Sequence, residues 1–419
     1  MGMTKRVLII GNGIIGLSSA LSALRRGYDV TVLDRNAEHI ENCSFGNSGM
    51  VVPSHFAPLA QPGVISQGLR WMRDPESPFY VQPRLSWDLM KWGMRFYMAT
   101  HKDQVTAGSV LLKEMHLASR ELYCQWQDEG IDCSLATRGL LMLCKSDHGL
   151  EEEAELAHKA RELGIPASVL DPQETVALDP NITMTVRGSV YYPKDCHLNP
   201  GQVIASLRSK IDSLGGKFVY GEHVVGWDER SGSLRAVRTS HGEFQADEFV
   251  LSTGVWSDGM SRPLGLKIPM QPGKGYSLTL PDPVELPKVC SILVESKVAV
   301  TPIGSSLRFG GTMQLGELNE SIDPRRLSGI LKSIPQYMPK FKSSHFEGIE
   351  PWVGLRPVSP DGLPYIGRPK GLKNLVVATG HAMMGVSLGP ITGELVGQIL
   401  SGEPTSIDLE HASVDRFRD

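Results

Sequence analysis

Long apolar runs are missing from this chain. No stretch of about 18 consecutive apolar residues occurs in its 419 residues, so we expect no transmembrane helix. The first residues lead directly into an apolar strand pattern at Val7, so we also expect no signal peptide. Both absences predict a cytoplasmic protein, and they leave open a peripheral position on the inner face of the membrane.

Cysteine is scarce, and its spacing forms no motif. No two cysteines are arranged as C-x-x-C, and no group of His, Cys and carboxylate residues has the spacing of a metal site. We therefore predict reduced thiols and no bound metal. The six cysteines are Cys43, Cys124, Cys133, Cys144, Cys196 and Cys290.

An excess of basic residues is also missing. The 42 Lys and Arg residues are outnumbered by 46 Asp and Glu residues, which gives a formal net charge of −4. A nucleic-acid-binding protein would show a basic stripe, so this class is excluded. The hydrophobic share of 41% and the charged share of 21% are ordinary for a globular enzyme, and 419 residues favour two domains.

The most informative stretch is VLIIGNGIIGL, which begins at Val7. Its apolar run predicts a buried parallel strand, followed by G-x-G-x-x-G and a helix over 17–26 that stops at Gly27. A second strand is expected over 29–33, and it ends in Asp34, 23 residues after Gly11. A strand, a glycine-rich turn, a helix and a distal acidic residue together indicate a dinucleotide site.

Each glycine of this motif has its own physical reason. Gly11 permits the tight turn, Gly13 lets the backbone approach a pyrophosphate, and Gly16 lets the helix pack closely on the strand. The helix N-terminus faces the negative phosphates, and the Asp34 carboxylate suits a ribose hydroxyl. The motif alone does not choose between FAD and NAD.

The rest of the chain predicts two kinds of sheet. Buried strands end in Gly11, Gly254 and Gly380, far apart in sequence, whereas alternating strands and turns over 266–345 indicate an antiparallel unit. Residues 54–82 are expected to be irregular. Helices are predicted over 17–26, 86–130, 150–163, 199–214, 324–334 and 385–400. Further strands are predicted over 139–145, 189–193, 217–220, 224–228, 234–239, 248–256, 276–280, 292–295, 298–302, 307–311 and 375–379.

One apolar stripe within 86–130 needs an interpretation of its own. Trp87, Met90, Trp92 and Phe96 recur at helical spacing. Such a stripe more often belongs to the core than to a ligand site, and we interpret it as core.

Five motifs in one order make the chain similar to a known family. It resembles the FAD-dependent D-amino acid oxidase superfamily over nearly its whole length. Bacterial D-amino acid dehydrogenases are nearest, with glycine and sarcosine oxidases more distant. The motifs are 11–16, 44–49, 273–277, 352–357 with 360–364, and 380–385.

The resemblance implies an α/β fold, α+β overall. A Rossmann-like FAD-binding domain would comprise 1–85, 193–262 and 346–419. A substrate-binding domain, built on a mostly antiparallel sheet with helices, would comprise 86–192 and 263–345.

The resemblance further implies a set of FAD-binding residues. The last predicted helix would begin at Gly385, and its positive end would face the flavin. No cysteine follows Cys290, so we expect the FAD to be non-covalent. The implied residues are Gly11, Gly13, Ile14, Ile15, Gly16, Asp34, Arg35, Ser44, Asn47, Ser48, Gly49, Met50, Val224, Thr253, Gly254, Trp256, Gly380, His381, Met384, Gly385, Val386 and Ser387.

Three residues are predicted to act on the substrate. Tyr276 and Arg356 match the family's tyrosine and arginine that bind the substrate carboxylate. An amino acid carboxylate favours a planar bidentate donor, and arginine provides one. His55 stands where relatives carry a tyrosine, and it is a candidate gate, carboxylate ligand or acceptor of an ammonium proton.

These residues predict the FAD-dependent oxidative deamination of D-amino acids to 2-oxo acids and ammonia, with hydride transfer from Cα to flavin N5. Arg308 loosely matches the position where sarcosine oxidases activate oxygen with lysine, which favours a quinone or respiratory-chain acceptor. Alternatives are a dehydrogenase or oxidase of D-proline, hydroxy-D-proline, sarcosine or glycine, a flavoprotein subunit active only in a hetero-oligomer, and an NAD-binding module. The oligomeric state is left open.

Overall fold

The computed structural model of the protein describes residues 4–38, 40–72, 74 and 76–418. Its first sheet has six strands, and all neighbours are parallel except the outermost pair β19–β20. The N-terminal, middle and C-terminal segments therefore meet in one sheet, as predicted. Across the sheet the strands are β19 (Tyr365–Gly367), β20 (Leu375–Thr379), β13 (Glu248–Leu251), β1 (Arg6–Ile10), β2 (Asp29–Leu33) and β9 (Lys217–Val219).

This sheet lies between a helical layer and a small second sheet. Alternate residues of each strand point to opposite faces, so Val7 and Ile9 pack with the helices while Leu8 and Ile10 pack on the other side. The helices are α1 (Ile14–Arg25), α7 (Pro200–Ser213) and α10 (Gly389–Ser401). The three-stranded sheet on the other face is β10 (Val224–Arg230), β11 (Ser233–Thr239) and β12 (Glu243–Gln245).

The second large sheet is mixed and mostly antiparallel. Its parallel pairs are β5–β15 and β4–β17, and α9 (Pro324–Tyr337) packs on one of its faces. The main path runs through β18 (Trp352–Val358), β14 (Gln271–Leu280), β17 (Ser306–Leu315), β16 (Val298–Ile303), β15 (Cys290–Leu293), β5 (Leu140–Cys144), β7 (Gly188–Tyr192) and β6 (Ser168–Leu170), and β4 (Phe79–Val81) pairs with β17.

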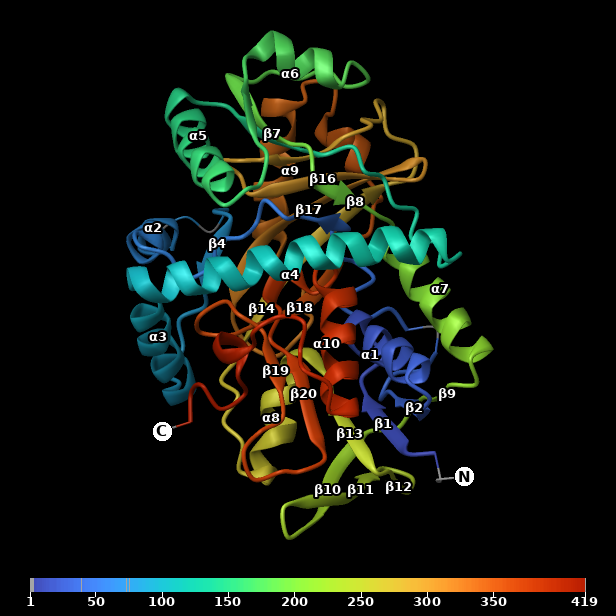
Figure 1. Cartoon of the computed structure of the whole chain (residues 1–419). Helices are drawn as coiled ribbons and strands as arrows, with labels where there is room; N and C mark the ends of the chain where they lie inside the picture. Colours follow the sequence, from blue (N-terminus) through green and yellow to red (C-terminus); the bar gives the residue numbers. More distant parts are fainter. Residues whose placement is uncertain (1–3, 39, 73, 75, 419) are drawn as a thin grey trace.

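Helix α4 (Lys102–Asp128) lies across the molecule between the six-stranded sheet and the mostly antiparallel sheet. It runs across the middle of Figure 1, from the side of α3 (Trp87–Ala99) to the side of α7. Its apolar face, with Leu111, Leu112 and Met115, packs against α10. The remaining elements are α2 (Val64–Trp71), α5 (Asp147–Glu162), α6 (Pro172–Leu178), α8 (Ser257–Ser261) and the strand pair β3 (Met50–Val51) with β8 (Cys196–His197).

The predicted α/β class with a Rossmann-like unit and a mostly antiparallel second sheet is confirmed. The proposed division into two domains stays a prediction. Residues 54–82 are more regular than expected, since α2 and β4 form there. Helix α1 begins at Ile14, three residues before the predicted start, and Gly27 follows its end with a φ of +81°.

The predicted start of the last helix was wrong. Helix α10 begins at Gly389, and residues 385–388 form turns. The reason is Pro390, which lacks an N–H and is tolerated only in the first turn of a helix. A helix beginning at Gly385 would have placed Pro390 in its second turn.

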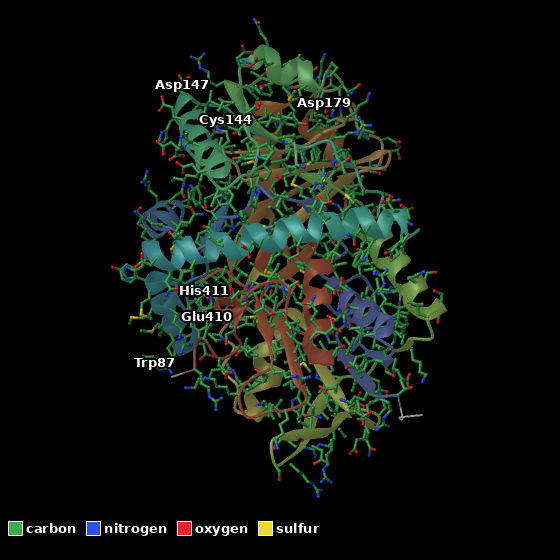
Figure 2. All side chains as sticks on the ribbon, in the orientation of Figure 1. Trp87, Cys144, Asp147, Asp179, Glu410 and His411 are labelled. Atoms are coloured by element: carbon green, nitrogen blue, oxygen red, sulfur yellow. The ribbon has the colours of Figure 1, made fainter. Side chains whose placement is uncertain are left out.

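The apolar stripe on α3 is core on one side only. Trp92 is buried and stacks on Phe96, with ring centroids 5.1 Å apart. Trp87 is 75% exposed and Met90 is 58% exposed, so interpreting these two as core was wrong. Figure 2 shows Trp87 at the periphery of the molecule. Helix α3 therefore carries a second apolar face that no described residue covers.

Candidate active site

One large cavity lies where the two large sheets meet, with a volume of about 1790 Å³. Drug-sized ligands occupy pockets of roughly 300–1,000 Å³, so this cavity has room for a dinucleotide and a substrate together. Its walls include the carboxyl ends of β1 and β2 and the N-terminus of α1. The loop 41–58, part of β18 and the turn 381–386 complete it.

The glycine-rich turn has the predicted geometry. Gly11 has a φ of +110°, and its N–H donates to Leu33 O at 2.8 Å. A Cβ on Gly16 would come within 1.9 Å of Gly11 O, so helix and strand need this glycine. A Cβ on Gly13 would meet only Ser44 Oγ, at 3.4 Å, because this residue faces the cavity. Backbone amides are thus presented to the cavity at a helix N-terminus.

Asp34 lies at the end of β2 and lines the cavity. Its Oδ2 accepts the Asn12 N–H at 2.7 Å, and its Oδ1 accepts the Asn36 N–H at 2.8 Å. Each carboxylate oxygen keeps a further lone pair for a ribose hydroxyl. Beside it, the Arg35 guanidinium lies 3.7 Å from the centre of the Trp256 ring, at the same wall.

The loop after Asp34 is held by hydrogen bonds between residues that the sequence analysis did not predict to be in contact. Ser44 Oγ accepts the Ile14 N–H at 3.1 Å, so this hydroxyl lies at the start of α1. Arg308 Nη1 donates to Phe45 O at 3.0 Å and to Asn47 O at 2.7 Å. The structure thus places Arg308 as a support for the loop backbone, and burial lowers its pKa.

The ends of β13 and β20 complete the nucleotide side of the cavity. Gly254 has a φ of +58° with open space around its missing side chain, and Thr379 Oγ1 donates to Gly254 O at 3.0 Å. His381 is buried and pairs with Thr392 Oγ1 at 3.0 Å, and burial lowers the pKa of His381 to about 3. This histidine is neutral, and it connects the turn 381–386 to α10.

The cavity brings together most of the predicted FAD-binding residues. Four of the predicted residues do not line the cavity themselves: Gly16, Gly49, Gly380 and Ser387. Those along its walls are Gly11, Gly13, Ile14, Ile15, Asp34, Arg35, Ser44, Asn47, Ser48, Met50, Val224, Thr253, Gly254, Trp256, His381, Met384, Gly385 and Val386. Since α10 begins four residues beyond Gly385, Gly385 is not at its N-terminus, and the contact of that N-terminus with a flavin stays a prediction.

Arg356 is a cavity-lining guanidinium with few protein partners. Its Nη1 donates to Thr312 O at 2.7 Å, and burial lowers its pKa. Among the described residues, no carboxylate lies within 4.0 Å of this guanidinium. The side chain lies over Gly275, where a Cβ would come within 2.1 Å of Nη1. A glycine is needed there so that Arg356 can occupy its place.

The Tyr276 side chain points to the other face of the same strand pair. In the regular register of β14 with β18, Gly275 is opposite Gly354 and Tyr276 is opposite Val353. The Tyr276 ring is 1% exposed and packs with Val353 in the core beneath α9. Its hydroxyl accepts the Asp323 N–H at 3.2 Å. Tyr276 and Arg356 thus both line the cavity, but they stand on opposite faces of the strand pair, and their role as a joint carboxylate site stays a prediction.

His55 also lines the cavity, and its Nδ1 lies 3.0 Å from Ser54 Oγ. Sequence reasoning missed Ser54 and its partner Asp195. No sequence signal joins these two residues, which are 141 positions apart.

Comparison with known proteins identifies the family. Residues 6–399 match the family described as FAD dependent oxidoreductase, so the chain belongs to this family and uses FAD. The glycine turn, Asp34 and the size of the cavity fit this cofactor. None of the helices in the described part of the chain has the length and apolar character of a membrane span.

Relatives of similar sequence are called D-amino acid dehydrogenase. The one from Granulibacter bethesdensis is 29% identical, over 98% of this chain and 99% of its own length. The one from Helicobacter pylori is also 29% identical, over 95% of both.

Solved structures share the fold. Glycine oxidase from Geobacillus kaustophilus has a TM-score of 0.78 and 23% identity, over 99% of both chains. L-proline dehydrogenase from P. horikoshii has a TM-score of 0.75 and 18% identity, over 100% of this chain and 98% of its own.

Proposed function

We propose that the protein oxidises the Cα–N bond of D-amino acids, yielding 2-oxo acids and ammonia. The observation that carries this proposal is Arg356. A half-buried guanidinium without a carboxylate partner in the described structure leaves its charge uncompensated unless an anion from the ligand pairs with it. A substrate carboxylate in the cavity supplies that anion and can accept two parallel hydrogen bonds. The names of the similar relatives support the D-amino acid class.

Different residues bind the cofactor and the substrate in this proposed reaction. FAD, when bound, supplies the two-electron acceptor that takes the hydride from Cα. Gly13 and Ser44 present hydrogen-bonding groups for its phosphates, and Asp34 is the proposed ribose ligand. Arg356 holds the substrate carboxylate and so limits the orientations of Cα–H, which is a positional contribution to the rate.

The decisive experiment is anaerobic mixing with matched D- and L-amino acids, with flavin bleaching as the signal. We expect D forms to bleach the flavin faster than L forms. Faster bleaching by L-alanine and L-proline would overturn the assignment. D-proline, hydroxy-D-proline, sarcosine and glycine belong in the panel, because preference for them would show a secondary-amine or glycine enzyme.

We further propose a non-oxygen electron acceptor and a peripheral position at the membrane. The support for the membrane position is the outer face of α3, where five exposed apolar side chains follow helical spacing with Lys91 beside them. Aromatic and basic residues on one apolar helix face suit the interface of an anionic lipid surface. The five are Trp87, Met90, Met94, Tyr97 and Met98.

A further inference from the structure

A chain of three hydrogen-bonded side chains leads from the protein interior to the cavity. Asp195 is fully buried, and its Oδ1 accepts the Ser54 N–H at 3.0 Å. The Ser54 hydroxyl bonds to Asp195 Oδ2 and also lies 3.0 Å from His55 Nδ1. Ser54 and His55 line the cavity, whereas Asp195 lies behind them. The structure gives His55 Nε2 no protein partner among the described residues.

Strand pairing creates this meeting of distant residues. β3 and β8 pair antiparallel, with Met50 opposite His197 and Val51 opposite Cys196. Asp195 immediately precedes β8, and Ser54 follows β3 by a short turn in which the His55 N–H donates to Val52 O at 2.9 Å. The pairing of β3 with β8 therefore places the Asp195 carboxylate within hydrogen-bond distance of the Ser54 hydroxyl.

The electrostatic surroundings favour storage of a proton on Asp195. Burial raises the pKa of Asp195 to about 7, and the Ser54 hydrogen bonds and Arg120 oppose that rise. Burial lowers the pKa of His55 to about 4, and Lys297 lowers it further. Near neutral pH, His55 is therefore neutral and Asp195 is close to its midpoint.

Other titratable groups surround the chain of side chains. His116, on α4, lies near His55, and burial lowers the pKa of His116 to about 3. Cys196 and Cys290 lie near Asp195, and burial raises the pKa of both thiols. Tyr192 is a further neighbour, with its pKa also raised by burial. All four are uncharged near neutral pH, and within the described part of the chain Lys297 acts as a fixed charge on His55 and Arg120 on Asp195.

We propose that Asp195, Ser54 and His55 form a relay that removes one proton from the ammonium group of the substrate. The inference rests on the proposed function, because an amino acid brings the ammonium group. An amino acid must lose this proton before its nitrogen lone pair can assist hydride departure from Cα. In this scheme His55 is the catalytic residue, and Ser54 and Asp195 act through it.

The proton movements balance. At the start Asp195 is ionised, the Ser54 hydroxyl donates to Asp195, and His55 Nδ1–H donates to Ser54 Oγ. His55 Nε2 then takes the ammonium proton, Nδ1 passes its proton to Ser54, and Ser54 passes its own proton to Asp195. The substrate changes from +1 to neutral at nitrogen, and Asp195 changes from −1 to neutral. Ser54 and His55 end neutral, with their hydrogen bonds reversed.

The first test measures flavin reduction in anaerobic single turnovers across pH. The variants are Asp195→Asn, Ser54→Ala and His55→Gln. General base catalysis contributes typically about 10²–10⁴-fold, so we expect a loss of at least about 10²-fold near neutral pH. Above the pKa of the substrate ammonium the free amine predominates in solution, and the variants should approach the wild-type rate. A loss of equal size at every pH would overturn the relay.

Asp179→Asn is the matched control. Asp179 is a buried aspartate whose Oδ2 accepts the backbone N–H groups of Lys288 and Val289 at 2.6 and 2.8 Å. It does not line the cavity, and Figure 2 shows it near α6 at the other end of the molecule from the termini. Its pH profile should keep the wild-type shape.

A second readout does not depend on turnover. Infrared difference spectra between acidic and alkaline solution should show a protonated carboxyl band that disappears around pH 7. This band should be absent in Asp195→Asn and present in Asp179→Asn. A wild-type spectrum without this band would overturn the proposal that Asp195 takes up the proton. If no amino acid reduces the wild-type flavin while the band is present, the proposed function fails and the titration of Asp195 stands.

Discussion

The Arg356 guanidinium lies directly over Gly275, and because side chains alternate along a strand, the neighbouring Tyr276 points to the opposite face of the sheet. The two residues that the sequence offers as carboxylate ligands therefore lie on opposite faces of one strand pair, although both line the cavity. Arg356 faces the cavity, while the Tyr276 hydroxyl serves the backbone of Asp323. This arrangement makes different predictions for the two side chains.

Replacing Arg356 by Lys should lower kcat/KM by about 10- to 100-fold, with normal FAD content. Lysine keeps the charge but loses the planar fork, and a charge-assisted hydrogen bond contributes about 1.5–3 kcal/mol. Tyr276→Phe should change kcat/KM by only a few-fold and should mainly lower the unfolding free energy, by about 1 kcal/mol. Steady-state kinetics and denaturation measure both. An unchanged kcat/KM in Arg356→Ala would show that the carboxylate is held elsewhere.

Gly275→Ala should resemble an arginine deletion although it leaves Arg356 in the sequence. The new Cβ would lie 2.1 Å from Nη1, so the guanidinium must leave its place. We expect a loss in kcat/KM of about 10-fold or more, since a small misplacement of a positioning group strongly lowers the reaction rate. Gly242→Ala, in the exposed turn between β11 and β12 with nothing within 4 Å of the new Cβ, is the control and should keep wild-type kinetics. Similar kinetics in both variants would contradict the assigned position of Arg356.

FAD should be released intact when the protein is denatured with acid. Asp34→Ala should weaken FAD retention about 10-fold, because the variant loses a ribose ligand and the acceptor that holds the Asn12 and Asn36 amides. Asp29→Ala, at the exposed start of the same strand, is the control. Flavin absorbance after dialysis measures retention. Flavin that stays with the precipitate would indicate a covalent bond.

The unfolding free energy should fall as pH falls below about 6.5. His116 and His381 have folded-state pKa values near 3, and His55 and His197 near 4, all below the ordinary value of 6.5. The unfolded chain therefore binds more protons in this window, at up to about 1.4 kcal/mol per pH unit for each histidine. Asp195, with its raised pKa of about 7, acts in the opposite direction as a single group.

The His381→Gln variant tests this pH dependence. Glutamine does not titrate, so the slope of unfolding free energy against pH between 4 and 6 should become shallower by up to about 1.4 kcal/mol per unit. Chemical denaturation at several pH values measures it. An unchanged slope in His381→Gln would contradict a neutral buried histidine.

The outer face of α3 should bind lipid vesicles. We expect the wild-type protein to sediment with anionic vesicles, and Trp87→Ser with Met94→Ser to reduce that binding at least several-fold. Val225→Ser is the control, because Val225 is 65% exposed on β10, far in sequence from α3. Size-exclusion chromatography should show the same oligomeric state for all three proteins. A smaller oligomer in the double variant would show instead that α3 contacts another copy.

Local sequence determined the nucleotide-binding half of the site. The G-x-G-x-x-G turn, Asp34 and the strands that lead to Gly254 and Gly380 were predictable, because each depends on residues close in sequence, although β13 ends at Leu251 and Gly254 begins a 3-10 turn instead of continuing the predicted strand 248–256. Glycines with positive φ and apolar strand runs follow from the sterics of single residues and short stretches. Most of the predicted FAD-binding residues accordingly lie along one cavity.

Only the tertiary structure decided the substrate side. The register of β14 with β18 separates Tyr276 from Arg356, and the pairing of β3 with β8 joins Ser54 to Asp195 across 141 residues. Side chains alternate between the two faces of a strand, so a family match at both positions does not say that they meet. The sequence specifies which residues can do the chemistry, and strand register decides which face of a strand each of them occupies.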